Sequence, residues 1–328
     1  MRRRDFISLL GGAAATWPRV ARAQLPALPM IAFLRTGSAE ADTRNVAAFR
    51  KGLSETGYVE GQNVTVEYYW LESPYDHLPA LMADLIRRRV AVITTIGTPQ
   101  VALTAKAATT TIPIVIGEGE DPVGLGLVAN LARPGGNVTG IYFLLDELAA
   151  KRLRLLHDMV PKAVRIAVLV NPANVQTTAT TLREVRDAAP TIGLQLQILN
   201  ASTISEIDAV FSTLERAPPD ALFVAPDAFF TSRRGQFATL TARGRIPAAY
   251  AVREPVEAGG LMSYGTDLAG AFHQVGVYTG KILKGEKPAD MPVLQSTKFE
   301  FVINQQTARA LDIKIPPDLL SIADEVIE

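Results

Sequence analysis

The chain has 328 residues, 48% of them hydrophobic, with 33 basic and 33 acidic side chains and no cysteine. Without clustered Lys and Arg it offers no electrostatic surface for nucleic acid or anionic membranes, and without cysteine it forms neither disulfides nor a cysteine-linked lipid anchor. A chain of this length exceeds what one hydrophobic core usually holds, so we expect two domains.

The first 23 residues have the pattern of an export signal. Arginines at positions 2 to 4 precede Phe6, an apolar run of small residues spans 9–15, and Ala21-Arg22-Ala23 supplies the small residues of a cleavage site. The paired arginines resemble a twin-arginine signal, which exports folded proteins. We expect cleavage after Ala23 and a periplasmic mature chain with 28 basic and 32 acidic residues. No later run has the ~20 apolar residues of a membrane-spanning helix.

Short apolar runs alternate with amphipathic stretches through the first half of the mature chain, a pattern typical of βα units that build a parallel sheet. Val46, Phe49 and Leu53 recur at helical spacing between the first two runs. The runs predict five buried strands, at Pro29–Leu34, Val64–Tyr69, Val90–Ile96, Ile112–Ile116 and Val138–Tyr142.

The same alternation restarts after residue 146. Strands are predicted at Arg165–Val170, Leu194–Leu199, Ala221–Ala225 and Pro247–Ala251, with helices around 178–188, 205–215 and 229–243. A long helix over 267–283, an extended run over 299–303 and a short terminal helix complete the chain. We therefore predict an α/β fold of two doubly wound parallel-sheet lobes with a ligand cleft between them.

Several short motifs of the sequence resemble those of a known family. They are Asp121-Pro122-Val123, the stretches 131–140 (LARPGGNVTG) and 257–265 (EAGGLMSYG), Ser232-Arg233-Arg234, Lys298-Phe299-Glu300 and Ala323-Asp324-Glu325-Val326. Over nearly the whole mature length, the chain resembles the ABC-transporter substrate-binding proteins, which include the tryptophan-binding TrpX-type proteins.

The resemblance implies the type I periplasmic-binding-protein fold, in which the chain crosses three times between the lobes. We expect hinges near residues 142–146, 251–254 and 291–295. The expected N-terminal lobe then contains 24–143 plus 254–291, and the expected C-terminal lobe contains 144–253 plus 292–328.

In open α/β sheets, ligands bind beyond the carboxyl ends of the strands, where loops and helix N-termini meet. Two such edges that face each other make a cleft. The loops expected there are 35–39, 97–100 and 117–121 in the first lobe, and 171–176, 226–229 and 250–254 in the second.

Polar residues of these loops are candidate ligand contacts. Thr98 followed by Pro99 fits a helix start whose free N–H groups meet an anionic group, with Thr36 nearby in the neighbouring loop. Asp227 is placed to pair with a ligand ammonium, although Thr98 and Asp227 also suit ordinary helix caps. Further candidates are Arg35 and Arg253 for a carboxylate, Asn171 for a hydrogen bond, and Tyr142, Phe229, Tyr250 and Tyr264 as aromatic walls, with solvated arginines and core aromatics as the alternatives.

The acidic stretch Glu118-Gly119-Glu120 replaces the small or apolar residues expected in such proteins. It favours a cationic or hydrogen-bond-rich ligand if the carboxylates of this stretch face the cleft. An amino acid, aromatic or branched, is suggested by the family resemblance alone.

Catalytic and metal-binding patterns are weak. The sequence Gly124-x-Gly126-x-x-Ala129 starts too far from the preceding strand for a dinucleotide fingerprint. The three histidines have no partners at metal-ligand spacing, and no nucleophile elbow or Walker loop occurs. We therefore expect no cofactor, no metal and no enzymatic activity.

The expected function is that of a monomeric periplasmic solute-binding protein that closes on a small molecule. The closed form would then dock on an ABC permease, whose ATPase subunit is a separate chain. Two alternatives remain open: a periplasmic sensor that presents its bound form to a membrane receptor, and an enzyme that uses the cleft.

Overall fold

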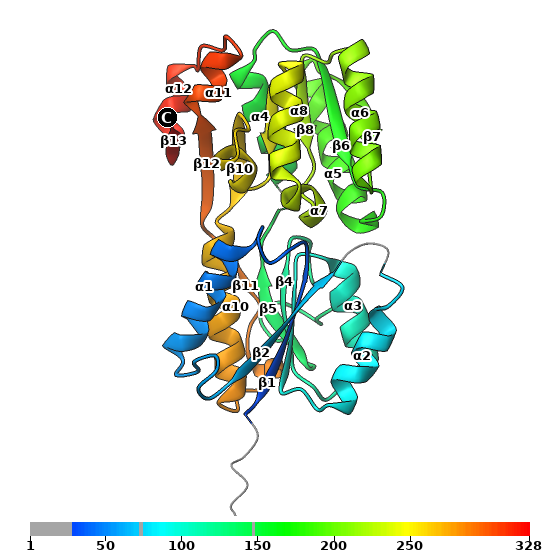
Figure 1. Cartoon of the computed structure of the whole chain (residues 1–328), viewed down its shortest axis with the longest axis vertical. Coiled ribbons are helices and arrows are strands. Elements are labelled where there is room, and N and C mark those ends of the chain that lie inside the picture. Colours follow the sequence, from blue (N-terminus) through cyan, green and yellow to red (C-terminus); the bar gives the residue numbers. More distant parts are fainter. Residues whose placement is uncertain (1–27, 72–74, 146–147) are drawn as a thin grey trace, which may run out of the picture.

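The computed structural model describes residues 28–71, 75–145 and 148–328. The expected export signal at 1–23 lies outside these residues, as does the last residue of the expected hinge 142–146. The described chain forms two α/β lobes stacked end to end, each built on its own sheet (Figure 1). This arrangement confirms the predicted fold class.

The first lobe is built on a sheet of six strands in the order β11-β5-β4-β3-β1-β2, with every neighbouring pair parallel. Helices α1 and α10 pack on one face of this sheet, and α2 and α3 pack on the other. The bounds are β1 Met30–Thr36, α1 Thr43–Glu55, β2 Thr65–Leu71, α2 Leu78–Arg87, β3 Val92–Ile96, α3 Pro99–Ala108, β4 Ile114–Glu118, β5 Val138–Tyr142, α10 Leu268–Leu283, the 3-10 turn η3 Pro288–Asp290 and β11 Leu294–Gln295.

The second lobe is built on seven strands in the order β13-β12-β10-β9-β8-β6-β7. Only the β10–β12 pair is antiparallel within this sheet. The bounds are α4 Ala149–Met159, β6 Arg165–Val170, α5 Val175–Ala188, η2 Ala189–Ile192, β7 Gln195–Asn200, α6 Ile204–Arg216, β8 Ala221–Val224, α7 Ala228–Ser232, α8 Arg234–Gly244, β9 Ala248–Tyr250, α9 Glu254–Glu257, β10 Met262–Thr266, β12 Phe299–Asn304, α11 Gln305–Ala310, α12 Pro317–Ile322 and β13 Glu325–Ile327.

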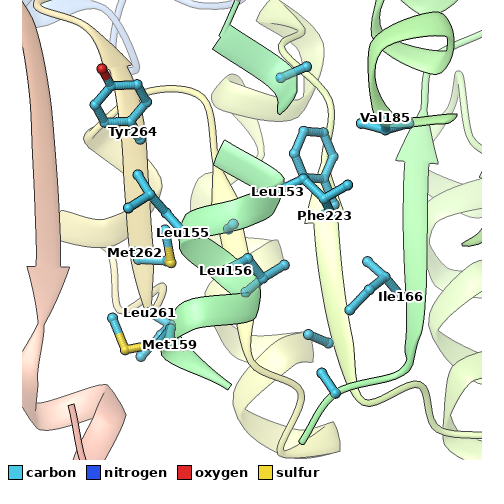
Figure 2. Packing of buried hydrophobic residues seen from close by; sticks show 14 of the residues in the cluster. Leu153, Leu155, Leu156, Met159, Ile166, Val185, Phe223, Leu261, Met262 and Tyr264 are labelled. Atoms are coloured by element: carbon cyan, nitrogen blue, oxygen red, sulfur yellow. The ribbon is translucent and has the colours of Figure 1, made fainter. Parts of the chain in front are cut away.

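The core of the second lobe shows how its helices are held. Leu153, Leu156 and Met159 recur at helical spacing on α4 and point into the layer between that helix and the sheet. Phe223 of β8 and Met262 of β10 meet them from the sheet (Figure 2). All five side chains are buried, and each contributes about 1.5–3 kcal/mol of transfer free energy. This packing fixes the strand ends on which the cleft depends.

Helices α1 and α10 lie side by side in the first lobe, and glycines bring their backbones together (Figure 1). A Cβ atom added at Gly52 of α1 would lie 2.0 Å from the carbonyl oxygen of His273. One added at Gly276 of α10 would lie 2.1 Å from the carbonyl oxygen of Phe49. Neither position has space for a side chain, so the helix pair depends on both glycines.

The last part of the chain, from residue 254 on, is divided between the two lobes differently from the predicted division at residue 291. Strand β10, within the range expected in the first lobe, pairs with β9 and β12 of the second sheet. Strand β11, expected in the second lobe, pairs with β5 of the first. The second crossing therefore follows β10, at residues 266–268, and not at 251–254, because the ladder to β9 holds β10 in the second sheet. The third crossing, at 296–298, directly follows the expected range 291–295.

Among the described residues, no helix combines the length and the apolar character that a bilayer crossing requires.

Candidate functional site

A cavity of about 230 Å³ lies where the carboxyl ends of the parallel strands in the two lobes face each other. Both lobes contribute to its wall, through the loops that follow β1 and β2 in the first and β6, β7 and β8 in the second. The lining residues are Thr36, Gly37, Ser38, Leu71, Tyr75, Asn171, Ala173, Asn174, Ser202, Thr203, Ile204, Phe229, Ser232 and Arg233. We call this space the interlobe cavity.

Hydroxyl groups form the polar part of the first-lobe wall. Thr36, the last residue of β1, shares hydrogen bonds with the Tyr75 hydroxyl at 3.0 Å and with Oγ1 of Thr98 at 2.8 Å. Thr98 precedes α3 with extended backbone angles, and Pro99 is the first residue of that helix, as predicted. The Thr98 side chain, however, bonds to Thr36 and does not cap its own helix. Thr98 thus holds Thr36 in position but does not itself line the cavity.

An amide and carboxylate network orders the second-lobe wall. Nδ2 atoms of Asn171 and Asn174 each donate to Oδ2 of Asp227 at 3.2 Å. Oδ1 of Asp227 accepts the backbone N–H of Phe230 at 3.2 Å and caps α7. Burial raises the pKa of Asp227, while the hydrogen bonds from the two asparagines lower it. Asp227 therefore fixes the loops that follow β6 and β8 relative to each other.

A second, smaller cavity of about 40 Å³ adjoins this network. Arg35, Glu120 and Asp227 are the charged residues in its wall, and Asn174 belongs to both cavities. Nε of Arg35 lies 3.0 Å from Oδ2 of Asp42, and the guanidinium also donates to the carbonyl of Ile96. The volume suits one or a few water molecules and is too small for an amino acid.

The lobes touch each other around the cavities. Oγ1 of Thr177 donates to Oε1 of Glu120, and Nη1 of Arg234 donates to the carbonyl of Ala41 at 3.2 Å. On α1, Arg44 forms an ion pair of 2.9 Å with Glu257 of α9. These contacts join residues of different lobes, so the structure has its lobes closed.

The predicted site residues divide into two groups. Thr36, Asn171 and Phe229 line the interlobe cavity, Arg35 and Asp227 line the smaller one, and Thr98 and Pro99 lie behind Thr36. The other five, Glu118, Tyr142, Tyr250, Arg253 and Tyr264, line neither cavity.

The three tyrosines belong to hydrophobic cores and not to the cleft wall. Tyr142 ends β5 and packs in the core of the first lobe, with 2% of its surface exposed. Tyr250 lies against Phe237 in an edge-to-face arrangement in the second lobe. The Tyr264 hydroxyl accepts a hydrogen bond of 2.6 Å from Nζ of Lys151. Each tyrosine lies on a strand and points into a sheet-helix layer, which explains the difference from the prediction.

Glu118 is fully buried in β4, and neither carboxyl oxygen has a hydrogen-bond partner in the described part of the chain. Burial raises the pKa of Glu118 well above its ordinary value; the charge of Glu120 raises it further and that of Arg35 lowers it. A carboxyl enclosed in this way is not accessible to a ligand in either cavity. The cationic ligand that the acidic stretch favoured therefore has no support from this residue.

Arg253 forms ion pairs outside both cavities. Its guanidinium pairs with Glu257 at 2.7 Å, Glu300 at 2.9 Å and Glu325 at 2.6 Å. These ion pairs tie α9 to β12 and β13, so Arg253 joins the C-terminal strands to the rest of the second lobe. Each of its three guanidinium nitrogens thus bonds to a carboxylate of the second lobe.

Several lining residues were not predicted, among them Tyr75, Ser202, Thr203 and Arg233. Thr203 starts α6 with a capping box to Glu206, a pattern that the sequence shows as Thr-x-x-Glu. Arg233 lies within the helix predicted over 229–243, which the structure breaks into α7 and α8 at this residue. The break turns Arg233 toward the cavity.

The described residues hold no cluster of three or more His, Asp or Glu side chains with the geometry of a metal site. Two lobes that enclose a cavity at their strand ends are typical of a protein that binds a small ligand. Solved solute-binding proteins of the type I periplasmic-binding-protein fold share this architecture.

Residues 31–327 match the family model described as ABC transporter substrate binding protein. The chain therefore belongs to the ABC-transporter substrate-binding protein family. It is 28% identical over 268 residues to the tyrosine-binding protein of Clostridioides difficile (strain R20291), which covers 81% of this chain and 76% of the relative.

Two solved structures give a conformational comparison. The ABC domain in complex with L-Trp from Streptococcus pneumonia superposes with a TM-score of 0.81 at 25% identity, over 92% of this chain and 100% of the other. The ligand-free, open structure of CD0873 from Clostridium difficile gives a TM-score of 0.63 at 25% identity, over 92% and 99%. The present structure thus resembles the ligand complex more than the open form, in agreement with the contacts between its lobes.

Proposed function

We propose that this chain is an exported solute-binding protein that delivers a small molecule, an amino acid or a related compound, to an ABC importer. The observation that carries the proposal is the interlobe cavity, whose wall comes from both lobes. Its volume of about 230 Å³ lies below the roughly 300–1,000 Å³ of typical sites for drug-sized molecules, which favours a ligand of amino-acid size. The names of the tyrosine-binding relative and the L-Trp complex support the same class.

In this proposal, ligand binding shifts the equilibrium between the open and closed arrangements of the two lobes. Only a closed pair of lobes contacts the ligand from both sides, so the ligand stabilises the closed form by its differential affinity. In this proposal a membrane permease recognises the closed form, and a separate ATPase subunit supplies the energy. The chain binds and releases its ligand without chemical change.

Export follows from the N-terminal sequence. The twin-arginine pattern and the Ala21-Arg22-Ala23 site support cleavage after Ala23 and a periplasmic location, as is usual for the family. Mass spectrometry of the protein recovered from the periplasm tests this directly, because a mature chain that begins at Gln24 is expected.

Ligand binding is tested by thermal unfolding of residues 24–328, refolded without carried-over ligand, against amino acids, organic acids, peptides, sugars and polyamines. A ligand present at 100 times its Kd adds about 2.7 kcal/mol to the free energy of unfolding, and the midpoint rises by several degrees. Small-angle scattering then reports whether the same compound reduces the radius of gyration.

Two substitutions serve as a matched pair. Ala173→Trp puts a large side chain into the wall of the interlobe cavity and is expected to abolish the shift. Ala217→Trp, at the exposed end of α6 outside the cavity, is expected to leave it unchanged. A panel in which no compound shifts the midpoint of the unsubstituted protein contradicts the proposed function.

A further inference from the structure

The charge of the interlobe cavity comes from one side chain. Among its described lining residues, Arg233 alone carries a formal charge, and the remainder are hydroxyl, amide, aromatic, aliphatic or glycine residues. The acidic residues of the cleft region, Glu120 and Asp227, line the smaller cavity instead. The described lining of the interlobe cavity therefore carries one positive charge and no negative one.

Arg233 has no counter-ion among the residues that the structure describes. It stands between α7 and α8, and its guanidinium carbon lies 5.5 Å from the centre of the Phe229 ring, another lining residue. Its Nε atom is buried and has no hydrogen-bond partner, and within the described ranges Arg233 forms no ion pair. A partly desolvated guanidinium with unmet donors is costly, and a planar oxyanion supplies matching acceptors.

The neighbouring arginines are engaged in other ways. Arg234 donates to the carbonyl of Ala41 across the cleft, and Arg35 is neutralised by Asp42 at 3.0 Å. Neither lines the interlobe cavity. Among the described residues that line the interlobe cavity, Arg233 is thus the one cation that a ligand can meet.

A ligand ammonium meets no comparable partner among the described residues that line the cavity. The nearest carboxylate in the network, Asp227, already accepts hydrogen bonds from Asn171, Asn174 and the N–H of Phe230. The lining groups that remain are neutral hydroxyls and amides, which do not offset the loss of hydration of an ammonium ion. The zwitterion of an amino acid would bury a positive charge in a space that is already positive.

We propose that the ligand is a monocarboxylate without an ammonium group, aromatic or branched aliphatic, and that Arg233 binds its carboxylate. The apolar part of the ligand lies against Leu71, Tyr75, Ile204 and Phe229. This inference rests on the proposed solute-binding function and specifies the substrate class of that site. It reverses the cationic preference expected from the acidic stretch.

Two matched sets of probes test the charge of the ligand while the apolar group stays the same within each set. The first set is 3-phenylpropanoate, L-phenylalanine and 2-phenylethylamine; the second is 4-methylpentanoate, L-leucine and 3-methylbutylamine. Titration calorimetry of residues 24–328 is expected to show, in at least one set, an acid that binds at least tenfold more tightly than its amino acid, with no binding of the amine. An amino acid that equals or exceeds its acid overturns the proposal, as does a failure of both acids to bind.

Substitutions test the role of the side chain. Arg233→Gln is expected to weaken binding of the acid at least tenfold, and Arg233→Lys, which keeps the charge but loses the planar fork, is expected to weaken it less. Arg243→Gln, on α8 outside the cavity and paired with Glu215, is the control and is expected to have no effect. Unchanged affinity of Arg233→Gln overturns the assignment.

The outcomes separate this inference from the proposed function. If an amino acid is the tighter ligand, the protein remains a solute-binding protein and only the substrate class is wrong. If neither these probes nor the broader panel of amino acids, peptides, sugars and polyamines shifts the unfolding midpoint, the solute-binding function itself fails.

Discussion

Thr177, near the start of α5, donates a hydrogen bond to Glu120, which follows β4 in the opposite lobe. Both side chains are buried, and both line the smaller cavity. This hydrogen bond joins the lobes only while they are closed, so it contributes to the closed form and not to the stability of either lobe alone.

Thr177→Val keeps the side-chain shape and removes the donor. Because a buried hydrogen bond contributes roughly 1 kcal/mol, we expect the closed form to lose about that amount and the Kd of the tightest compound in the ligand panel to rise about fivefold. Titration calorimetry measures the Kd. Thr213→Val on α6, where the hydroxyl bonds only within its own helix, is the control. Equal Kd values for the Thr177 variant and the unsubstituted protein would show that this contact has no part in closure.

Gly276→Ala tests the close approach of α10 to α1. The added Cβ would lie 2.1 Å from the carbonyl oxygen of Phe49, so the helices must move apart. We expect a loss of about 1–3 kcal/mol in the free energy of unfolding, as for other overpacked cores, measured by urea denaturation. Gly235→Ala on α8 meets no atom within 4 Å and is expected to be neutral or stabilising by up to about 1 kcal/mol. A Gly276 variant as stable as the Gly235 variant contradicts the tight helix contact.

Glu118→Gln tests the buried carboxyl of β4. Burial raises the pKa of Glu118 above its ordinary value of 4.5, so the folded protein holds this proton to a higher pH than the unfolded chain does. The contribution of the carboxyl to stability is fully present below about pH 4.5 and is lost as the pH rises through the folded pKa. The midpoint of Glu118→Gln relative to the unsubstituted protein should therefore increase from pH 4 to pH 8.

The decisive measurement is how the difference in unfolding midpoint between Glu118→Gln and the unsubstituted protein changes with pH. The difference at a single pH is not enough, because an amide in this position changes hydrogen bonding at every pH. Glu40→Gln, at an exposed position, is the matched control and should show no such slope. If the difference between Glu118→Gln and the unsubstituted protein is constant or falls as the pH rises, Glu118 is ionised in the folded protein and the assignment is wrong.

Most strands of both sheets could be predicted from sequence because they are buried on both faces and read as continuous apolar runs. The observed bounds of β5 and β6, Val138–Tyr142 and Arg165–Val170, coincide with the predicted ones. Strand β10 was missed as a strand, since its residues MSYGT include two small polar side chains and a glycine. Strand β11 has two exposed residues at a sheet edge and carries no apolar pattern at all.

The site was predictable at the level of loops but less so at the level of side chains. The topology of a parallel sheet brings the strand ends together, so Thr36, Asn171 and Phe229 lie where the rule for such sheets places ligands. The direction of a side chain depends on contacts between distant segments, which a single sequence does not contain. Arg253 and Arg233 are both arginines beside a helix start, yet Arg253 pairs with three carboxylates and Arg233 pairs with none in the described part of the chain.

The division of the tail also determines when each lobe can form during synthesis. The core of the first lobe requires α10 and β11, whose residues are made only after most of the second lobe. The second sheet in turn is completed by β13, at residues 325–327. Neither sheet can be completed from the first half of the chain, because the first needs residues 294–295 and the second needs residues 325–327. The two lobes are therefore completed close together in time.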